Sequence, residues 1–386
     1  MIKILKLLAS FLLFSYSIFA EVNGHEKLFY IFQDTSKISN LKNSETSHIL
    51  INQLRFNFQQ GPFFFSHDLN LMAGFGKELT RKDLGVMKPR FRLFSIENSQ
   101  ISLAQKNLII DHNLDRLKFL FSFSRFDISV GRQAFSFGSA RFVNPTDPLK
   151  NTGFNFIDEE YRPGLDGVSL VYHLSHLSEL ELAYIGDEEI SLTSPKVIRF
   201  KNNFVQHDLE FILIFFYGRT LFGGSGEGSF FESGYYWEAS LVEDPVETNF
   251  FRASLGIVHQ FSNDLFLNIE YHYNGIGRQD RFLKLDDISK NFAYKKAGVF
   301  LLRENYLFSS LSKSFSSIHQ LSATSAYSFD DRSIINALRF QYSINSELYL
   351  NFSSMFSYLF TAKSNQDTNE FIGFPTQLSF GLFYYW

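Results

Sequence analysis

The clearest pattern in this chain is strict alternation of apolar and polar residues over segments of about ten residues. In residues 207–217 Asp208 and Glu210 lie on one face, and the opposite face carries Leu209, Phe211, Leu213, Phe215 and Tyr217. Residues 113–123 and 265–275 repeat this arrangement. Successive side chains of a β-strand point to opposite faces, so this period of two predicts strands with one apolar and one polar face.

The same pattern predicts about eighteen strands along the chain. They lie near residues 48–58, 63–75, 99–110, 113–123, 126–137, 163–175, 178–187, 195–203, 207–217, 220–230, 234–242, 250–260, 265–275, 304–312, 319–329, 333–343, 348–360 and 377–386. One such strand also suits a soluble sandwich. A long succession without a helical segment favours an all-β fold, a transmembrane antiparallel up-and-down β-barrel of about 18 strands, with 16 as the alternative.

The last strand is the most informative one. In residues 377–386 the apolar residues Leu378, Phe380 and Leu382 share one face with Tyr384 and Trp386, and the chain stops on an aromatic residue. This ending resembles the assembly signal of Gram-negative outer-membrane barrels, carried here by Ser379, Gly381, Tyr384 and Trp386. The resemblance implies barrel-assembly machinery and periplasmic chaperones as partners, and an outer membrane of lipid and lipopolysaccharide as the location.

Counting back from that end predicts a topology. If the last strand finishes in the periplasm, the joints near 124–125, 262–264 and 345–347 are short periplasmic turns. The long connections 138–162, 276–303 and 361–376 are then external loops. Short turns inside and long loops outside are typical of such barrels. A barrel of this size is wide enough to hold an aqueous lumen.

The beginning of the chain agrees with export. Residues 1–20 have the form of a signal peptide, with Lys3 and Lys6 before an apolar run that ends near Ala20. That run is too short for a membrane anchor. We expect residues 21–46, which are polar and weakly patterned, to form a periplasmic segment, and residues 47–386 to form the barrel domain.

Composition supports this class. Aromatic residues make up 18% of the chain and 48 residues are Phe, yet polar residues at alternate positions hold the mean hydropathy near zero. Removing the predicted signal peptide takes away two lysines, so the formal charge moves from −4 to −6. This balance gives no reason to expect nucleic-acid binding. The absence of cysteine suits an exported protein that folds without disulfides.

One region indicates more than barrel wall. Apolar residues change phase between Val130 and Phe135, which predicts a bulge near Gly131 that aims Arg132 into the lumen. The connection that follows carries Asn144-Pro145-Thr146-Asp147, then Asp158, Glu159 and Glu160, and then a return at 162–167. This order resembles a pattern in large porin-like outer-membrane proteins.

Two interpretations of that connection stay open. It folds inward and narrows the pore, where charged side chains would screen solutes by size and charge, or it forms a turn with a solvated acidic lid. The candidates for lining or narrowing a pore are Arg116, Lys118, Arg132, Asp147, Asp158, Glu159, Glu160, Glu210, Glu238, Arg252, Glu270 and Arg339.

These features predict a passive channel for small hydrophilic solutes. The alternatives are a transporter or exporter dedicated to one substrate class, such as a polysaccharide, and a surface barrel that binds a partner through its external loops. Whether copies form a homo-oligomer stays open. The sequence contains no metal motif or nucleotide-binding loop, and we expect neither a cofactor nor catalysis. The Asp330-Asp331 pair is better explained as a turn than as an acid–base pair.

Overall fold

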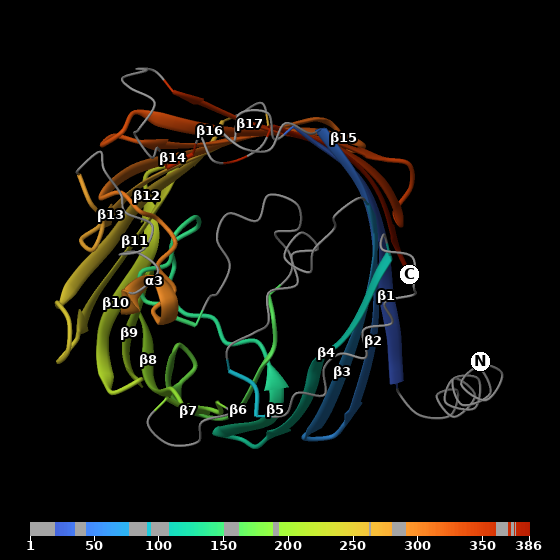
Figure 1. The fold of residues 1–386 in the computed structure, drawn as a ribbon. Helices are drawn as coiled ribbons and strands as arrows, with labels where there is room; N and C mark the ends of the chain where they lie inside the picture. Colours follow the sequence, from blue (N-terminus) through green and yellow to red (C-terminus); the bar gives the residue numbers. More distant parts are fainter. Residues whose placement is uncertain are drawn as a thin grey trace.

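The computed structural model describes residues 20–34, 44–76, 91–93, 108–149, 162–187, 193–261, 264–279, 291–359, 370–371, 374 and 376–386. Within these residues, eighteen antiparallel strands form one closed sheet around a central space (Figure 1). The first strand, β1 (Ala20–Asp34), pairs with both β2 (Ser44–Gln60) and the last strand, β18 (Thr376–Tyr385), and so closes the ring. The predicted barrel of about 18 strands is confirmed.

The remaining strands follow in chain order, each paired with its neighbours in sequence. They are β3 (Phe63–Gly76), β4 (Leu108–Ser122), β5 (Phe126–Gln133), β6 (Leu165–Ser175), β7 (Ser178–Ile185), β8 (Lys196–Phe204), β9 (His207–Phe216), β10 (Arg219–Phe230), β11 (Ser233–Glu243), β12 (Phe250–Gln260), β13 (Leu265–Asn274), β14 (Asn305–Ser316), β15 (His319–Ser328), β16 (Ser333–Ser343) and β17 (Leu348–Leu359). One short helix, α3 (Phe292–Lys296), lies between β13 and β14. Among the described helical residues, none belongs to a helix long and apolar enough to span a bilayer.

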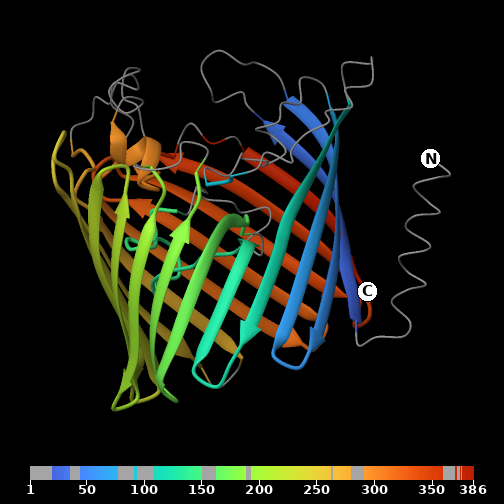
Figure 2. The ribbon, with the colours of Figure 1, turned by 90° about the horizontal axis from the view of Figure 1, so that it is seen from below.

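The connections at the two ends of the barrel differ in length, as the topology counted back from the last strand predicted. Every connection at the end that carries Trp386 is short, such as 61–62 between β2 and β3 or 231–232 between β10 and β11. The connections at the other end include 134–164 and 275–304 (Figure 2). Short connections hold neighbouring strands in register, and long ones have the length to reach into or across the barrel.

The period of two separates the two faces of the wall. On β12, Leu255 and Ile257 are exposed outward at 59% and 58%, while Arg252 and Ser254 on the opposite face are buried inside. β13 repeats this with Ile269 and Tyr271 outward. An apolar outer face and a polar inner face are what a barrel needs when lipid surrounds it and water fills it.

The prediction for residues 21–46 was wrong. Residues 20–34 form β1 and residue 44 already belongs to β2, so this part of the chain is barrel wall. The alternation is hidden here because both faces are apolar: Leu28 and Tyr30 point outward, while Phe29 and Ile31 pack inside against Ile49 and Ile51.

The segment before β5 also differs from expectation. We predicted two strands, 99–110 and 113–123, whereas the structure has the single strand β4, and residues 94–107 lie outside the described chain. β4 carries a bulge: Asp68 pairs with Arg116 and Leu69 pairs with Leu114, so Asp115 is an extra residue. The strand number agrees with the prediction because β1 replaces the strand at 99–110.

The closure of the ring depends on a close approach between Gly24 and Trp386. Gly24 N–H donates to the Trp386 carbonyl oxygen at 2.9 Å, and Trp386 N–H donates to the Gly24 carbonyl at 3.0 Å. A Cβ atom added at Gly24 would lie 2.4 Å from the Gln53 carbonyl oxygen and 2.8 Å from the Trp386 ring. Only glycine fits without moving backbone.

We therefore expect Gly24→Val to weaken closure by about 1–3 kcal/mol, the usual cost of overpacking a tight site. Refolding into detergent, followed by the heat-dependent shift in gel mobility and urea unfolding, measures this. Gly234→Ala is the matched control, because its nearest neighbour would lie 3.8 Å away. Equal stability of the two variants would contradict the role of Gly24.

Candidate functional site

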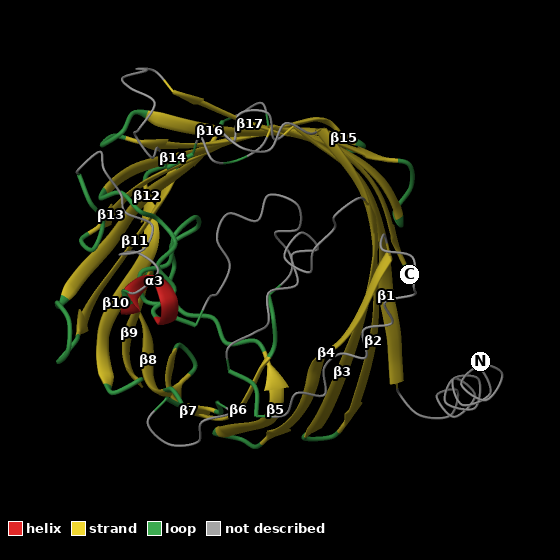
Figure 3. Cartoon of the chain, viewed as in Figure 1, coloured by secondary structure: helices red, strands yellow, loops and turns green. Residues whose placement is uncertain are grey.

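The connection between β5 and β6 leaves the wall and enters the barrel, as the described residues 134–149 show in Figure 3. The departure begins at Gly131, whose φ of +114° is a conformation that other residues rarely adopt. A Cβ atom there would lie 2.0 Å from the Leu117 carbonyl oxygen. The predicted bulge is absent, because β5 keeps continuous register with β4 and β6 through this residue. Phe135 and Phe137 lie beyond the end of β5 and pack inside the barrel, which accounts for the apparent change of phase.

Arg132 anchors the start of that connection. Its Nε donates to Asp166 Oδ1 at 2.7 Å and its Nη2 donates to Asp166 Oδ2 at 3.0 Å, while Nη1 donates to the Leu114 carbonyl at 2.7 Å. The side chain is buried. Arg132 therefore ties β4, β5 and β6 together rather than presenting its charge to the lumen.

The bulged residue Asp115 anchors the other end of the connection. Its Oδ2 lies 2.7 Å from Arg116 Nη1, and its Oδ1 accepts from Gly164 N–H at 3.0 Å. Arg116 Nη2 also donates to the Arg162 carbonyl at 2.6 Å, and Arg162 pairs with the buried Asp147 inside the connection. The bulge thus places the Asp115 carboxylate beside Gly164, just before the chain re-enters the wall at β6.

Three glutamates on the opposite inner wall receive the loop. Glu210 on β9, Glu238 on β11 and Glu270 on β13 point inward from alternate strands, and we call them the carboxylate row. Glu210 Oε1 accepts from Gly138 N–H at 3.0 Å. Glu238 accepts from Ala140 N–H at 2.8 Å and from both the N–H and the hydroxyl of Thr146 at 2.7 Å.

Glu270 holds three consecutive backbone N–H groups. Arg141 and Phe142 donate to its Oε2 at 2.9 and 3.0 Å, and Val143 donates to its Oε1 at 3.0 Å. The Tyr236 hydroxyl adds a donor to Oε2 at 2.9 Å. Tyr236 fits because Gly256 faces it: a Cβ there would lie 2.1 Å from the ring. A buried carboxylate is stabilised by such donors, and the donors are stabilised by the charge.

Side chains of the wall also donate hydrogen bonds to carbonyl groups of the loop. Ser240 Oγ and Arg252 Nη2 donate to the Pro145 carbonyl at 2.8 and 2.7 Å, and Ser254 Oγ donates to the Val143 carbonyl at 2.8 Å. Backbone groups inside a barrel need partners as much as those in a soluble core. Here the side chains of β11 and β12 supply them.

An apolar cluster completes the seat of the loop. Phe135, Phe137 and Leu149 pack against inward residues of β7, β8 and β9, including Ile185 and Ile214. Phe292 and Ala293 of α3 belong to the same cluster, and Figure 1 shows α3 on the inner side of the ring near β9 and β10. Burial of these side chains fastens the loop independently of the carboxylate row.

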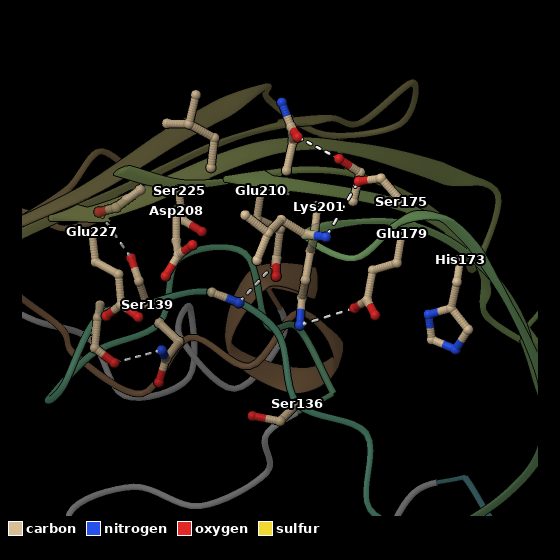
Figure 4. Close-up of a pocket in the computed structure, with 18 of the residues that line it drawn as sticks. Ser136, Ser139, His173, Ser175, Glu179, Lys201, Asp208, Glu210, Ser225 and Glu227 are labelled. Atoms are coloured by element: carbon tan, nitrogen blue, oxygen red, sulfur yellow. Dashed lines mark hydrogen bonds and ion pairs between the residues drawn. The ribbon is translucent and has the colours of Figure 1, made fainter. Parts of the chain in front are cut away.

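A polar recess lies on the inner wall beside the loop, and a second one lies on β14–β18, where no described loop residue lines it. The larger, about 540 Å³, lies between residues 136–144 and the ends of β6–β10 that lead to the short turns (Figure 4). It contains two ion pairs: Lys201 Nζ lies 3.5 Å from Glu179, and Arg141 Nη2 lies 2.9 Å from Glu227. The smaller recess, about 240 Å³, is lined by hydroxyl and amide side chains of β14–β18 and by Arg339.

The structure places the predicted site residues in three groups. Glu210, Glu238, Arg252 and Glu270 face inward as their phase predicted, but the loop covers them, and the last three are only 1%, 2% and 0% exposed. Arg116, Arg132 and Asp147 hold the ends of the loop. Arg339 lines the smaller recess and Lys118 is half-buried on β4. Asp158, Glu159 and Glu160 lie outside the described residues.

Several residues of the site were missed. Asp115, Asp166, Tyr236 and Ser254 all touch the loop or its anchors. The sequence around Asp115 has no feature that predicts a bulge. Gly256 could have been noticed, because a glycine inside a strand often makes room for a large neighbour, here the inward Tyr236 on the adjacent strand. The glycine-rich run 223–228 lies in β10 in regular register; a Cβ at Gly223 would lie 2.6 Å from Thr146 Cγ2, so it too makes room for the loop.

At the end of the barrel that carries the long connections, Glu370 joins the connection before β18 to those before β14 and β16. Glu370 accepts from Leu302 N–H at 3.0 Å and from the Tyr306 hydroxyl at 2.9 Å, and its own N–H donates to Asp331 at 2.6 Å. Asp330 accepts from the N–H groups of Glu304 and Asn305. The aspartate pair therefore supports these turns. Burial raises the pKa of Glu370 from 4.5 to about 7, against the opposing effect of its donors.

Comparison with known proteins was informative only at the level of the fold. No family model matches the sequence, and no curated protein matches it. Among solved structures, OccAB4 of Acinetobacter baumannii is 9% identical with a TM-score of 0.58, covering 95% of this chain and 98% of that one. The BenF-like porin of Pseudomonas fluorescens Pf-5 (10%, 0.56) and OccK9 of Pseudomonas aeruginosa (12%, 0.55) have the same coverages. The protein has the fold of Gram-negative outer-membrane porins.

We expect Glu270→Gln to destabilise the folded barrel by about 1.5–3 kcal/mol, because the amide group replaces an accepting oxygen among N–H donors. Urea unfolding of the refolded protein in detergent measures this. Glu227→Gln is the control, since its ion pair with Arg141 is exposed and contributes about 0–1 kcal/mol. Similar losses in both variants would contradict the anchoring role.

The Glu370 contact should depend on pH. A carboxyl group whose pKa is raised on folding stabilises the contact most below its unfolded pKa, here 4.5, and loses that contribution as the pH rises through about 7. We expect hydrogen exchange at the Leu302 amide, corrected for intrinsic rate, to quicken between pH 5 and 8 in the wild type and to stay level in Glu370→Gln. Stronger protection at higher pH would contradict this.

Proposed function

We propose that the protein is an outer-membrane channel through which small hydrophilic solutes diffuse passively. The observation that carries the proposal is the division of the inner wall into two parts. The loop covers the inward side chains of β9–β13, while the inward Ser, Thr and Gln side chains of β14–β18 line an open recess. A closed barrel of 18 strands is wide enough for water beside such a loop.

The loop sets the width of that channel in this proposal. Residues 134–149 lie inside the ring of strands, where they occupy space that water would otherwise fill (Figure 1). The wall satisfies both the N–H and the carbonyl groups of this segment, so it stays in place without help from solute. A fixed loop gives a fixed limit on solute size.

The charges beside the passage are mixed. The larger recess carries Glu179, Asp208 and Glu227 with Lys201 and Arg141, and the smaller recess carries Arg339 without a carboxylate among its lining residues. Opposite charges at a constriction give a field across the pore rather than along it. This arrangement supports weak ion selectivity and passage of small polar solutes of either charge.

The fold-level likeness to a porin supports the same class of function and the same membrane. In that setting the end with Trp386 and the short turns faces the periplasm. Lipopolysaccharide surrounds the outer half, and the barrel-assembly machinery with its chaperones inserts the chain. The buried Ser254–His272 contact is an anchor for the loop in this account, not a catalytic pair, because the loop covers both residues.

Single-channel recording in a planar bilayer tests the proposal. We expect the wild type to give stable ohmic steps, and replacement of residues 139–146 by a Gly-Ser linker to raise the conductance roughly twofold or more, since a flexible linker no longer holds the constriction. The control replaces Phe231 and Glu232 by Gly-Ser in the short turn between β10 and β11, where Phe231 is 90% exposed. This control should conduct like the wild type.

A folded wild-type barrel that shows no conductance at any voltage would contradict the open channel. Unchanged conductance after replacement of 139–146 would contradict the loop as its constriction, and would leave the channel itself standing.

A further inference from the structure

The outer face of the barrel over β14–β16 carries a row of small polar side chains. Ser309 on β14 pairs in register with Ser325 on β15, and Ser325 pairs with Asn336 on β16. All three side chains point outward, because they share a face of their strands with the exposed residues Leu311, Leu321 and Leu338. We call Ser309, Ser325 and Asn336 the outer polar row.

This row lies within the apolar belt rather than at its border. On the side toward the long connections it is followed by Leu307, Tyr327 and Ile334, and on the other side by Leu311, Ala323 and Leu338. Both flanking rows are apolar or aromatic. The polar row is therefore placed at a depth where lipid chains, not water, would surround it.

The hydrogen bonds of the row are incomplete. Ser325 Oγ donates to Asn336 Oδ1 at 2.7 Å. Within the described residues, neither the Asn336 amide nitrogen nor Ser309 Oγ has a hydrogen-bond partner. Lipid chains offer no acceptor, so polar groups at this depth are unfavourable unless protein supplies one.

Another outward polar pair on the barrel is arranged differently. Asn52 Nδ2 donates to Glu26 Oε1 at 3.1 Å, which uses the amide donor within the chain. Glu26 also lies opposite Tyr384, close to the aromatic end of the barrel. In the outer polar row the Asn336 amide donor is not used in this way. Small side chains allow membrane-embedded segments to approach closely.

We propose that a second copy of this chain packs against β14–β16 through the outer polar row, related by a twofold axis near Asn336. A carboxamide carries both a donor and an acceptor, so two Asn336 side chains facing each other exchange a pair of hydrogen bonds. Such a surface is complementary to itself, as a twofold interface requires. Polar side chains that find partners in this way drive association of membrane-embedded segments.

The test counts copies of the full chain in vesicles of phosphatidylethanolamine and phosphatidylglycerol. The chain has no cysteine, so Val246→Cys provides a single labelling site on an exposed connection. We expect photobleaching to give mostly two steps at low protein density. Adding Asn336→Leu should lower the two-step fraction at least tenfold, while the heat-dependent gel shift reports that the barrel still folds.

Oxidative crosslinking gives an independent measurement. We expect Ser325→Cys to form a covalent dimer in these vesicles, whereas Leu255→Cys, equally outward on β12, should not. Single-step bleaching of the wild type, with no Ser325→Cys dimer, would overturn the proposal and leave lipid as the occupant of this face. Three-step bleaching would overturn the twofold arrangement, and equal two-step fractions in wild type and Asn336→Leu would overturn the role of the row.

Discussion

The hydrogen bonds that Glu238 and Glu270 accept from the backbone of residues 140–146 are the interactions on which the interior of this barrel depends. A chain segment that enters a barrel brings N–H and carbonyl groups that need partners. The inner wall supplies glutamates for the donors, and Ser240, Arg252 and Ser254 for the acceptors. Glu238, Arg252 and Glu270, which the sequence predicts to line a pore, lie beneath the loop and fix its position.

The strands of the barrel wall could be predicted from the sequence, because the pattern that marks them arises within each strand. Lipid outside and polar surroundings inside impose a period of two on each strand, and strands such as β12 and β13 keep it over most of their length. β1 was missed because Phe29 and Ile31 pack inside the barrel, which makes both faces apolar over residues 28–32. The period marks a strand only where its two faces meet different surroundings.

The site was readable only in part. The inward phase of Glu210, Glu238 and Glu270 follows from the pattern, and so does an Asn-Pro-Thr-Asp segment in a long connection. Their meeting does not, because about 70 to 130 residues separate each glutamate from its donors in sequence. The roles of the Asp115 bulge and of Gly223, which makes room for Thr146, can be recognised only once the position of the loop is known. Long-range polar contacts leave no periodic trace.

A designed disulfide between the loop and the wall tests the seat of the loop most directly. A Cβ at Gly223 would lie 3.2 Å from Thr146 Cβ, near the separation of about 3.5–4.5 Å that disulfides need. In the refolded, otherwise cysteine-free protein, Thr146→Cys/Gly223→Cys should close rapidly under mild oxidation. Thr146→Cys/Gln320→Cys, which pairs the loop with the opposite wall, should stay open. Failure of the first pair to close, or equal closure of both, would contradict a loop held on β9–β13.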